Sequence, residues 1–233
     1  MLEPILEADE WQMTLGERAA LEGVLGALGP RIAIEIGTDQ GGSLARIAAH
    51  SEEVHSFDLE HSPELSWPGN AVLHSGDSHE LLPAFLATLA EEGQNVDFVL
   101  VDGDHTAEGV RQDLEDLLAS PAIGRSVIVV HDTLNDEVRR GVCSARICER
   151  PEAVLHDPDF VAGHLSSSGH YENHLWGGLG LILVDREGGA FAGAEAGGSG
   201  FEDAFTVFAD FRDRRVAAQR MRRWRLPRRG RSR

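Results

Sequence analysis

One short segment, 32–43, constrains the fold of this chain more than any other. It reads IAIEIGTDQGGS, so a run of mostly β-branched residues ends in a glycine and continues into a turn of small residues. Such a run predicts a buried parallel strand, and Ser43 is suited to cap a helix over 44–50. Three glycines allow the backbone of the turn to approach a ligand closely: Gly37, Gly41 and Gly42. The segment therefore predicts a strand, a ligand-binding turn and a helix in succession.

The turn differs from the dinucleotide-binding fingerprint Gly-x-Gly-x-x-Gly, because Asp39 stands where the second glycine would be. An acid beside the turn would repel a pyrophosphate seated at the helix N-terminus. A cationic ligand such as a sulfonium is the better electrostatic match. An NAD-dependent oxidoreductase built on a similar sheet is the alternative enzyme.

The charge of the chain is divided unevenly between a long acidic part and a short basic one. The formal net charge is −18, and all 21 basic residues are arginine. Eleven of them lie in 212–233 beside one acid, Asp213, so this segment carries +10 and the other 211 residues carry −28. An acidic body is poorly suited to nucleic-acid binding, so nucleic acid is not the expected partner. The tail alone could contact RNA, an acidic partner or the body, which makes an RNA-associated protein the non-enzymatic alternative. We expect the tail to be dispensable for chemistry.

The sequence predicts neither export nor membrane insertion. The first residues are acidic, unlike a signal peptide, and no apolar stretch approaches the length that spans a bilayer. Cys143 and Cys148 lie five positions apart on a predicted helix, so their side chains point to different faces. Reduced thiols, a cytoplasmic location and no membrane contact are therefore expected.

Strand and helix patterns alternate over most of the chain. Strands are predicted at 31–36, 53–58, 71–75, 96–101, 126–131 and 177–185, and helices at 43–50, 78–92, 106–119 and 134–149. This alternation predicts an α/β fold with a doubly wound, Rossmann-like, mostly parallel sheet and helices on both faces.

The same patterns divide the chain into four regions. They are a helical lead-in at 1–30 with Thr14 as its cap, a main domain at 31–185, a Gly/Ala-rich linker at 186–200, and a basic helix and tail at 201–233. Within the main domain, residues 151–178 are predicted to hold one weak strand and a polar, His-rich loop.

Acidic residues recur where the predicted strands end. The strand ends read Glu35-x-Gly37, Asp58, Gly76-Asp77-Ser78, Asp102 and His131-Asp132. Asp58 follows Gly37 by 21 positions, the distance expected of an acid that accepts hydrogen bonds from ribose hydroxyls. Any one of these acids could be a helix cap or a solvated loop residue. Their convergence on one sheet edge favours a binding site.

At these strand ends the chain resembles class I S-adenosylmethionine-dependent methyltransferases over about 31–185. Its motifs are most similar to those of small-molecule O-methyltransferases related to the catechol, macrolide-sugar and cephalosporin-biosynthesis enzymes. The resemblance implies methyl transfer to a small-molecule hydroxyl in secondary metabolism. Many relatives pair with a second copy, so a homo-oligomer is possible, but the sequence does not fix the oligomeric state. The resemblance also implies a set of residues that bind the cofactor: Glu35, Gly37, Thr38, Ser43, Asp58, Gly76, Asp77, Ser78 and Asp102.

The metal-dependent members of this group bind a divalent cation after the fourth and fifth strands. The resemblance places the ligands at Asp102, His131 and Asp132, and His131 stands where the family more often has a carboxylate. Imidazole binds manganese, iron or zinc better than magnesium. Either the metal is softer here, or His131 is the base that deprotonates the acceptor hydroxyl. The third alternative is a histidine that only forms hydrogen bonds at the strand end. His105, on the loop after Asp102, is a second catalytic candidate or a pocket wall, and Trp176 is a candidate aromatic wall.

Overall fold

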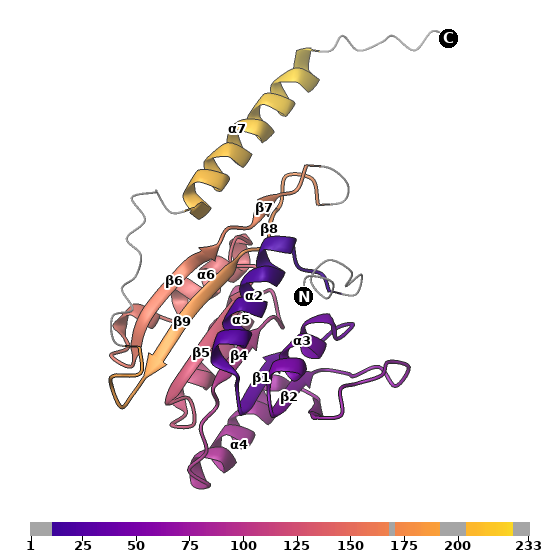
Figure 1. Cartoon of the computed structure of the whole chain (residues 1–233). Coiled ribbons are helices and arrows are strands. Elements are labelled where there is room, and N and C mark those ends of the chain that lie inside the picture. Colours follow the sequence, from indigo (N-terminus) through magenta and orange to yellow (C-terminus); the bar gives the residue numbers. More distant parts are fainter. Residues whose placement is uncertain (1–10, 168–170, 192–203, 226–233) are drawn as a thin grey trace.

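The computed structural model describes residues 11–167, 171–191 and 204–225, and its centre is a seven-stranded sheet (Figure 1). The strand order is β3-β2-β1-β4-β5-β9-β6, and within this sheet β9 alone runs in the opposite direction to the other strands. The strands are β1 (Ile32–Ile36), β2 (Glu53–Asp58), β3 (Ala71–Ser75), β4 (Phe98–Val101), β5 (Arg125–His131), β6 (Ala153–Val161) and β9 (Leu179–Asp185). The predicted mostly parallel, doubly wound sheet is confirmed.

The register of the parallel strands aligns their carboxyl ends. Ile36 in β1 pairs with Phe57 in β2 and with Val101 in β4, and Val101 in turn pairs with Val130 in β5. The residues that follow these strands therefore meet at one edge of the sheet. The strand order reverses between β1 and β4, which is the switch point at which sheets of this kind bind ligands.

Helices cover both faces of the sheet and bury a separate core on each. One face packs against α2 (Leu15–Leu28) and α3 (Gly42–His50), through residues such as Leu25 and Ile47. The other packs against α4 (Ser78–Glu91), α5 (Ala107–Ala119) and α6 (Asp136–Ser144), through residues such as Leu86 and Leu114. Burial of these apolar faces stabilises the three layers.

The structure shortens one predicted helix. The predicted helix at 134–149 is α6 followed by a single turn, η1 (Ile147–Glu149), because Asn135 caps α6 and Arg146 adopts a left-handed backbone with φ +51°. Cys143 and Cys148 are both free, as predicted.

The region 151–178 holds more structure than the single weak strand predicted for it. After β6 comes a short hairpin of β7 (His164–Leu165) and β8 (Leu175–Trp176). Its arms are also joined by Ser166 N–H donating to the His174 carbonyl and Asn173 N–H donating to the Ser166 carbonyl, each at 2.9 Å.

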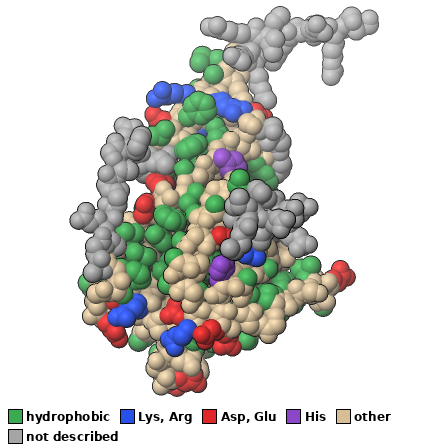
Figure 2. Space-filling model, viewed as in Figure 1, with side chains coloured by type: hydrophobic (Ala, Val, Ile, Leu, Met, Phe, Trp, Pro, Cys, Tyr) green, Lys and Arg blue, Asp and Glu red, His purple; other side chains and the backbone are tan. Residues whose placement is uncertain are grey.

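The basic helix predicted within 201–233 is α7 (Ala204–Arg225), which extends away from the sheet beyond the β7–β8 hairpin (Figure 1). Basic and apolar side chains are both visible over this end of the molecule (Figure 2). No helix in the described part of the chain is long and apolar enough to cross a membrane. Most of the predicted linker, 192–200, and the tail 226–233 lie outside the described residues.

Candidate active site

A cavity of about 560 Å³ lies at the carboxyl edge of the sheet. It is lined by the turn after β1, the end of β2, the loop that leads into α4, the loop after β4 and the segment 11–13. Eight of the nine predicted cofactor residues contribute to its wall: Gly37, Thr38, Ser43, Asp58, Gly76, Asp77, Ser78 and Asp102. The ninth, Glu35, is fully buried behind the wall.

Glu35 is an acid without access to water. Ser43 Oγ donates a hydrogen bond of 2.6 Å to Glu35 Oε1, and Oε2 has no hydrogen-bond partner among the described residues. Burial raises the pKa of Glu35 to about 8; the Ser43 hydrogen bond opposes this, and the charges of Asp102 and Asp58 add to it. The predicted capping role of Ser43 is wrong. Helix α3 begins at Gly42 with Gly41 as its cap, and Ser43 contacts Glu35 instead.

The glycine after β1 is required by packing within the protein, in addition to the approach of a ligand predicted for it. Gly37 has φ +87°, and a Cβ atom added there would lie 2.2 Å from the carbonyl oxygen of Asp102. The turn therefore packs directly on the backbone at the end of β4. Gly41, with φ +78°, is covered in the same way by the ring of Trp67, which would lie 2.7 Å from an added Cβ atom.

Asp58 joins the ends of two strands. Its Oδ2 accepts hydrogen bonds from the backbone N–H groups of Thr38 at 2.7 Å and Asp39 at 3.2 Å. Asp77 caps α4, and its Oδ1 accepts from the N–H of His79 at 2.9 Å. Both carboxylates line the cavity, and both also order the loops around it through these hydrogen bonds.

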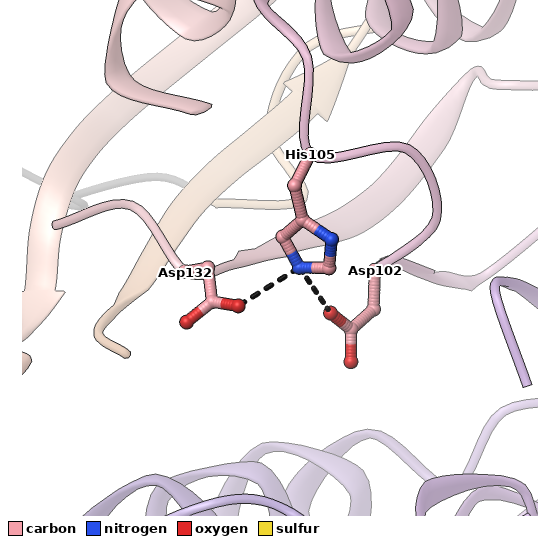
Figure 3. A group of neighbouring side chains, drawn as sticks. All are labelled: Asp102, His105 and Asp132. Atoms are coloured by element: carbon pink, nitrogen blue, oxygen red, sulfur yellow. Dashed lines mark ion pairs between the residues drawn. The ribbon is translucent and has the colours of Figure 1, made fainter. Parts of the chain in front are cut away.

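The loops after β4 and β5 bring a histidine between two aspartates (Figure 3). His105 Nε2 lies 2.8 Å from Asp132 Oδ2 and 3.7 Å from Asp102 Oδ1. One ligand atom from each of the three lies within 4.8 Å of the others, so the group could hold a metal ion. The hydrogen bond to Asp132 raises the pKa of His105 despite partial burial. Asp132 has φ +56°, a strained conformation that its partners must hold in place.

His131 approaches the same aspartates from inside the protein. Its side chain is only 7% exposed and its ring does not line the cavity. Nδ1 lies 2.9 Å from Asp102 Oδ1 and 3.6 Å from Asp132 Oδ2, and Nε2 lies 3.8 Å from Glu17 Oε2. Burial alone would lower the pKa of His131, but the surrounding carboxylates outweigh it and hold the pKa well above its usual value.

Glu17 belongs to the site, although no motif in the sequence marks it as a site residue. Its carboxylate accepts from the N–H of Thr14 at 2.5 Å and from the N–H of Gly178. The N–H of Gly177, one residue earlier, donates to Asp132 Oδ1 at 2.6 Å. Burial opposes ionisation, yet His131 and these N–H donors lower the pKa of Glu17 to about 2. The only signal in the sequence was the spacing Thr14-x-x-Glu17, which is a capping box and indicates a helix start.

The lead-in also contributes directly to the cavity wall. Trp11, Gln12 and Met13 line the cavity, and Gln12 Nε2 donates to Asp39 Oδ2 at 2.8 Å. No motif in the sequence marked these residues. On the other side of the site, the Trp176 ring meets the His105 ring edge-on with centroids 5.9 Å apart, consistent with the predicted aromatic wall.

Residues 34–133 match the model of a protein family described as a methyltransferase domain. Over these residues the chain is similar to a methyltransferase domain. The matched residues span β1 to β5, and so include the strand ends that form the cavity and the Asp102, His105 and Asp132 group. The family model does not reach the lead-in or the turn at Gly177 and Gly178.

Solved structures of O-methyltransferases share the fold of this chain. An O-methyltransferase from Bacillus cereus in complex with SAH is 16% identical, with a TM-score of 0.53 over 78% of this chain and 90% of that chain. TomG, an O-methyltransferase from Streptomyces achromogenes, is 17% identical, with a TM-score of 0.56 over the same shares. A putative O-methyltransferase from Klebsiella pneumoniae is 16% identical, with a TM-score of 0.52 over 79% and 87%. No curated protein matches the chain.

Proposed function

We propose that this methyltransferase transfers a methyl group from S-adenosylmethionine to a hydroxyl of a small molecule. The observation that carries the proposal is the cavity, in which Asp58 and the loops after β1 and β3 lie beside the Asp102, His105 and Asp132 group. The similar structures from Bacillus cereus and Streptomyces achromogenes hold SAH and SAM, which supports the cofactor. The second is described as involved in tomaymycin synthesis, which supports an acceptor from secondary metabolism.

The acidic wall suits a cationic donor. Asp39, Asp58 and Asp102 face the cavity, so a sulfonium gains favourable interactions there and a pyrophosphate does not. In the reaction the carbon–sulfur bond breaks as the new carbon–oxygen bond forms, and the electron pair stays on sulfur. Such a displacement depends mainly on holding donor and acceptor in line. The acceptor hydroxyl must lose its proton to become a good nucleophile.

We assign the handling of that proton to the group at Asp102, His105 and Asp132. His105 is 41% exposed and lines the cavity, whereas His131 is buried behind Asp102. Two aspartates and one imidazole form a donor set that fits manganese, iron or zinc better than magnesium. When bound there, a divalent cation would lower the pKa of an acceptor hydroxyl. His131 then positions Asp102, and His105 is the ligand or the base.

Calorimetry with S-adenosylhomocysteine tests the cofactor. We expect the chain to bind it, and Asp58→Ala to weaken binding by about 1–3 kcal/mol because the ribose hydroxyls lose a charged acceptor. Asp58→Asn retains the size of the side chain and part of its hydrogen bonding, so it should lose less. Binding of NAD but not of S-adenosylhomocysteine would instead establish the oxidoreductase alternative.

The same calorimetry with Mn²⁺ in place of the cofactor tests the metal. Manganese should bind the unmodified chain, and both Asp102→Ala and His105→Ala should weaken that binding at least tenfold. Methyl transfer that continues after exhaustive chelation would exclude the metal and leave His105 as the base.

A further inference from the structure

Helix α7 holds the end of the β7–β8 hairpin through several polar contacts. Arg215 Nη2 donates to the Ser167 carbonyl at 3.0 Å and lies 3.8 Å from the carboxylate of Glu172. Gln219 Nε2 donates to Glu172 Oε1 at 3.0 Å, and Asn173 Nδ2 donates to Gln219 Oε1 at 3.1 Å. Both arms of the hairpin are therefore bound by one face of the helix.

The same helix is anchored to the body near its beginning. Arg212 Nη1 donates to Asp136 Oδ2, at the start of α6, at 2.5 Å. The Arg139 guanidinium, buried on α6, lies over the ring of Phe205 at 5.1 Å from its centroid. With one end fixed to α6 and its middle fixed to the hairpin, α7 restricts where the hairpin can lie.

The hairpin in turn forms one side of the reaction site. Trp176 on β8 meets His105 edge-on, and Tyr171 packs against Trp176 with ring centroids 5.4 Å apart. His105 is the member of the Asp102, His105 and Asp132 group that is most exposed. A displacement of the hairpin therefore changes both the shielding of His105 and the space beside it.

We propose that α7 supports the hairpin against His105 and thereby limits access to the acceptor side of the site. This inference rests on the proposed function, since it concerns the acceptor side of that site. It differs from the sequence-based expectation that the basic tail is dispensable for chemistry. The arginines near the middle of α7 contact Asp136 and Glu172 of the same chain, so docking on the body accounts for part of its basic charge. Arg215 and Gln219 act as positioning residues.

The test compares two variants of the full chain that change the same helix. Arg215→Ala with Gln219→Ala removes the contacts to the hairpin. Arg214→Ala is the matched control, because Arg214 is exposed and forms its ion pair with Asp210 on α7 itself. Amide hydrogen exchange reports opening of 164–176, and modification by diethyl pyrocarbonate, located by mass spectrometry, reports access to His105.

We expect exchange in the hairpin and modification of His105 to be about tenfold faster in the double variant and unchanged in the control. Affinity for S-adenosylhomocysteine should be unchanged in both, because the hairpin does not line the cofactor cavity. Equal exchange and equal modification in all three proteins would overturn the support role. Failure of even the unmodified chain to bind S-adenosylhomocysteine would count against the proposed function alone, and the exchange result would still decide the role of α7.

Discussion

The buried acid Glu35 should make the stability of this protein fall as pH rises. Its pKa is 4.5 in an ordinary environment and about 8 in the folded chain, so the folded state retains a proton that the unfolded state releases. Stability contributed by this proton is fully present below pH 4.5 and is lost as pH rises toward 8. Glu35→Gln keeps the shape of the side chain and cannot ionise, so it should remove this part of the pH dependence.

The size of the effect follows from the shift. A difference of about 3.5 pKa units corresponds to about 5 kcal/mol, of which about 4 kcal/mol falls between pH 5 and pH 8. The free energy of unfolding of Glu35→Gln, relative to the unmodified protein, should therefore increase by about 4 kcal/mol over that interval.

Urea unfolding of both proteins without cofactor, at pH 5, 6, 7 and 8, measures this difference directly. Ser43→Ala is the control, because it removes the hydrogen bond to Glu35 and leaves the ionisable group. It should be less stable than the unmodified protein yet retain its decline with pH. Parallel curves for Glu35→Gln and the unmodified protein would refute the assignment of a neutral, buried Glu35.

Two further predictions concern the packing and the charge around the site. Gly37→Ala should destabilise the protein by at least about 1–3 kcal/mol in thermal unfolding, because the new Cβ atom would meet the Asp102 carbonyl. The control Gly23→Ala, on the exposed side of α2, should be neutral or slightly stabilising. Glu17→Gln should cost about 1–3 kcal/mol at pH 7, and this cost should shrink as pH falls from 4.5 toward 2, where the native carboxylate takes up its proton. Equal losses for the two glycine variants, or a Glu17→Gln cost that does not change with pH, would contradict these accounts.

The parts of the site that could be predicted are those set by strand ends. A parallel sheet brings the residues that follow its strands to one edge, so Asp58 and Asp102 were placed correctly from the alternation of strands and helices alone. The choice between His105 and His131 could not be made in this way. His131 is the last residue of β5 and is buried, whereas the next residue, Asp132, has a positive φ and its carboxylate contacts His105. That backbone conformation has no signature in the sequence.

The remaining gaps concern contacts between distant segments. Glu17 carries a clear capping-box pattern, and that pattern accounts for Glu17 without any reference to a site. Its second partner, Gly178, is 161 residues away, and nothing local connects the two. Likewise the arginines of α7 could be interpreted as a charge surplus, but their partners Asp136 and Glu172 emerge only from the tertiary structure.

The turn at Gly177 and Gly178 sets an order in which the protein can assemble. Its two successive N–H groups bind Asp132, 45 residues earlier, and Glu17, 161 residues earlier. Closing loops of that length is slow compared with local structure formation. Strands β1 to β4, with Asp58 and Asp102, need only the first half of the chain, so a nascent polypeptide can form the cofactor wall before the turn has been synthesised. The Asp102, His105 and Asp132 group, by contrast, can be completed only after the turn has been synthesised, because the turn binds both Glu17 and Asp132.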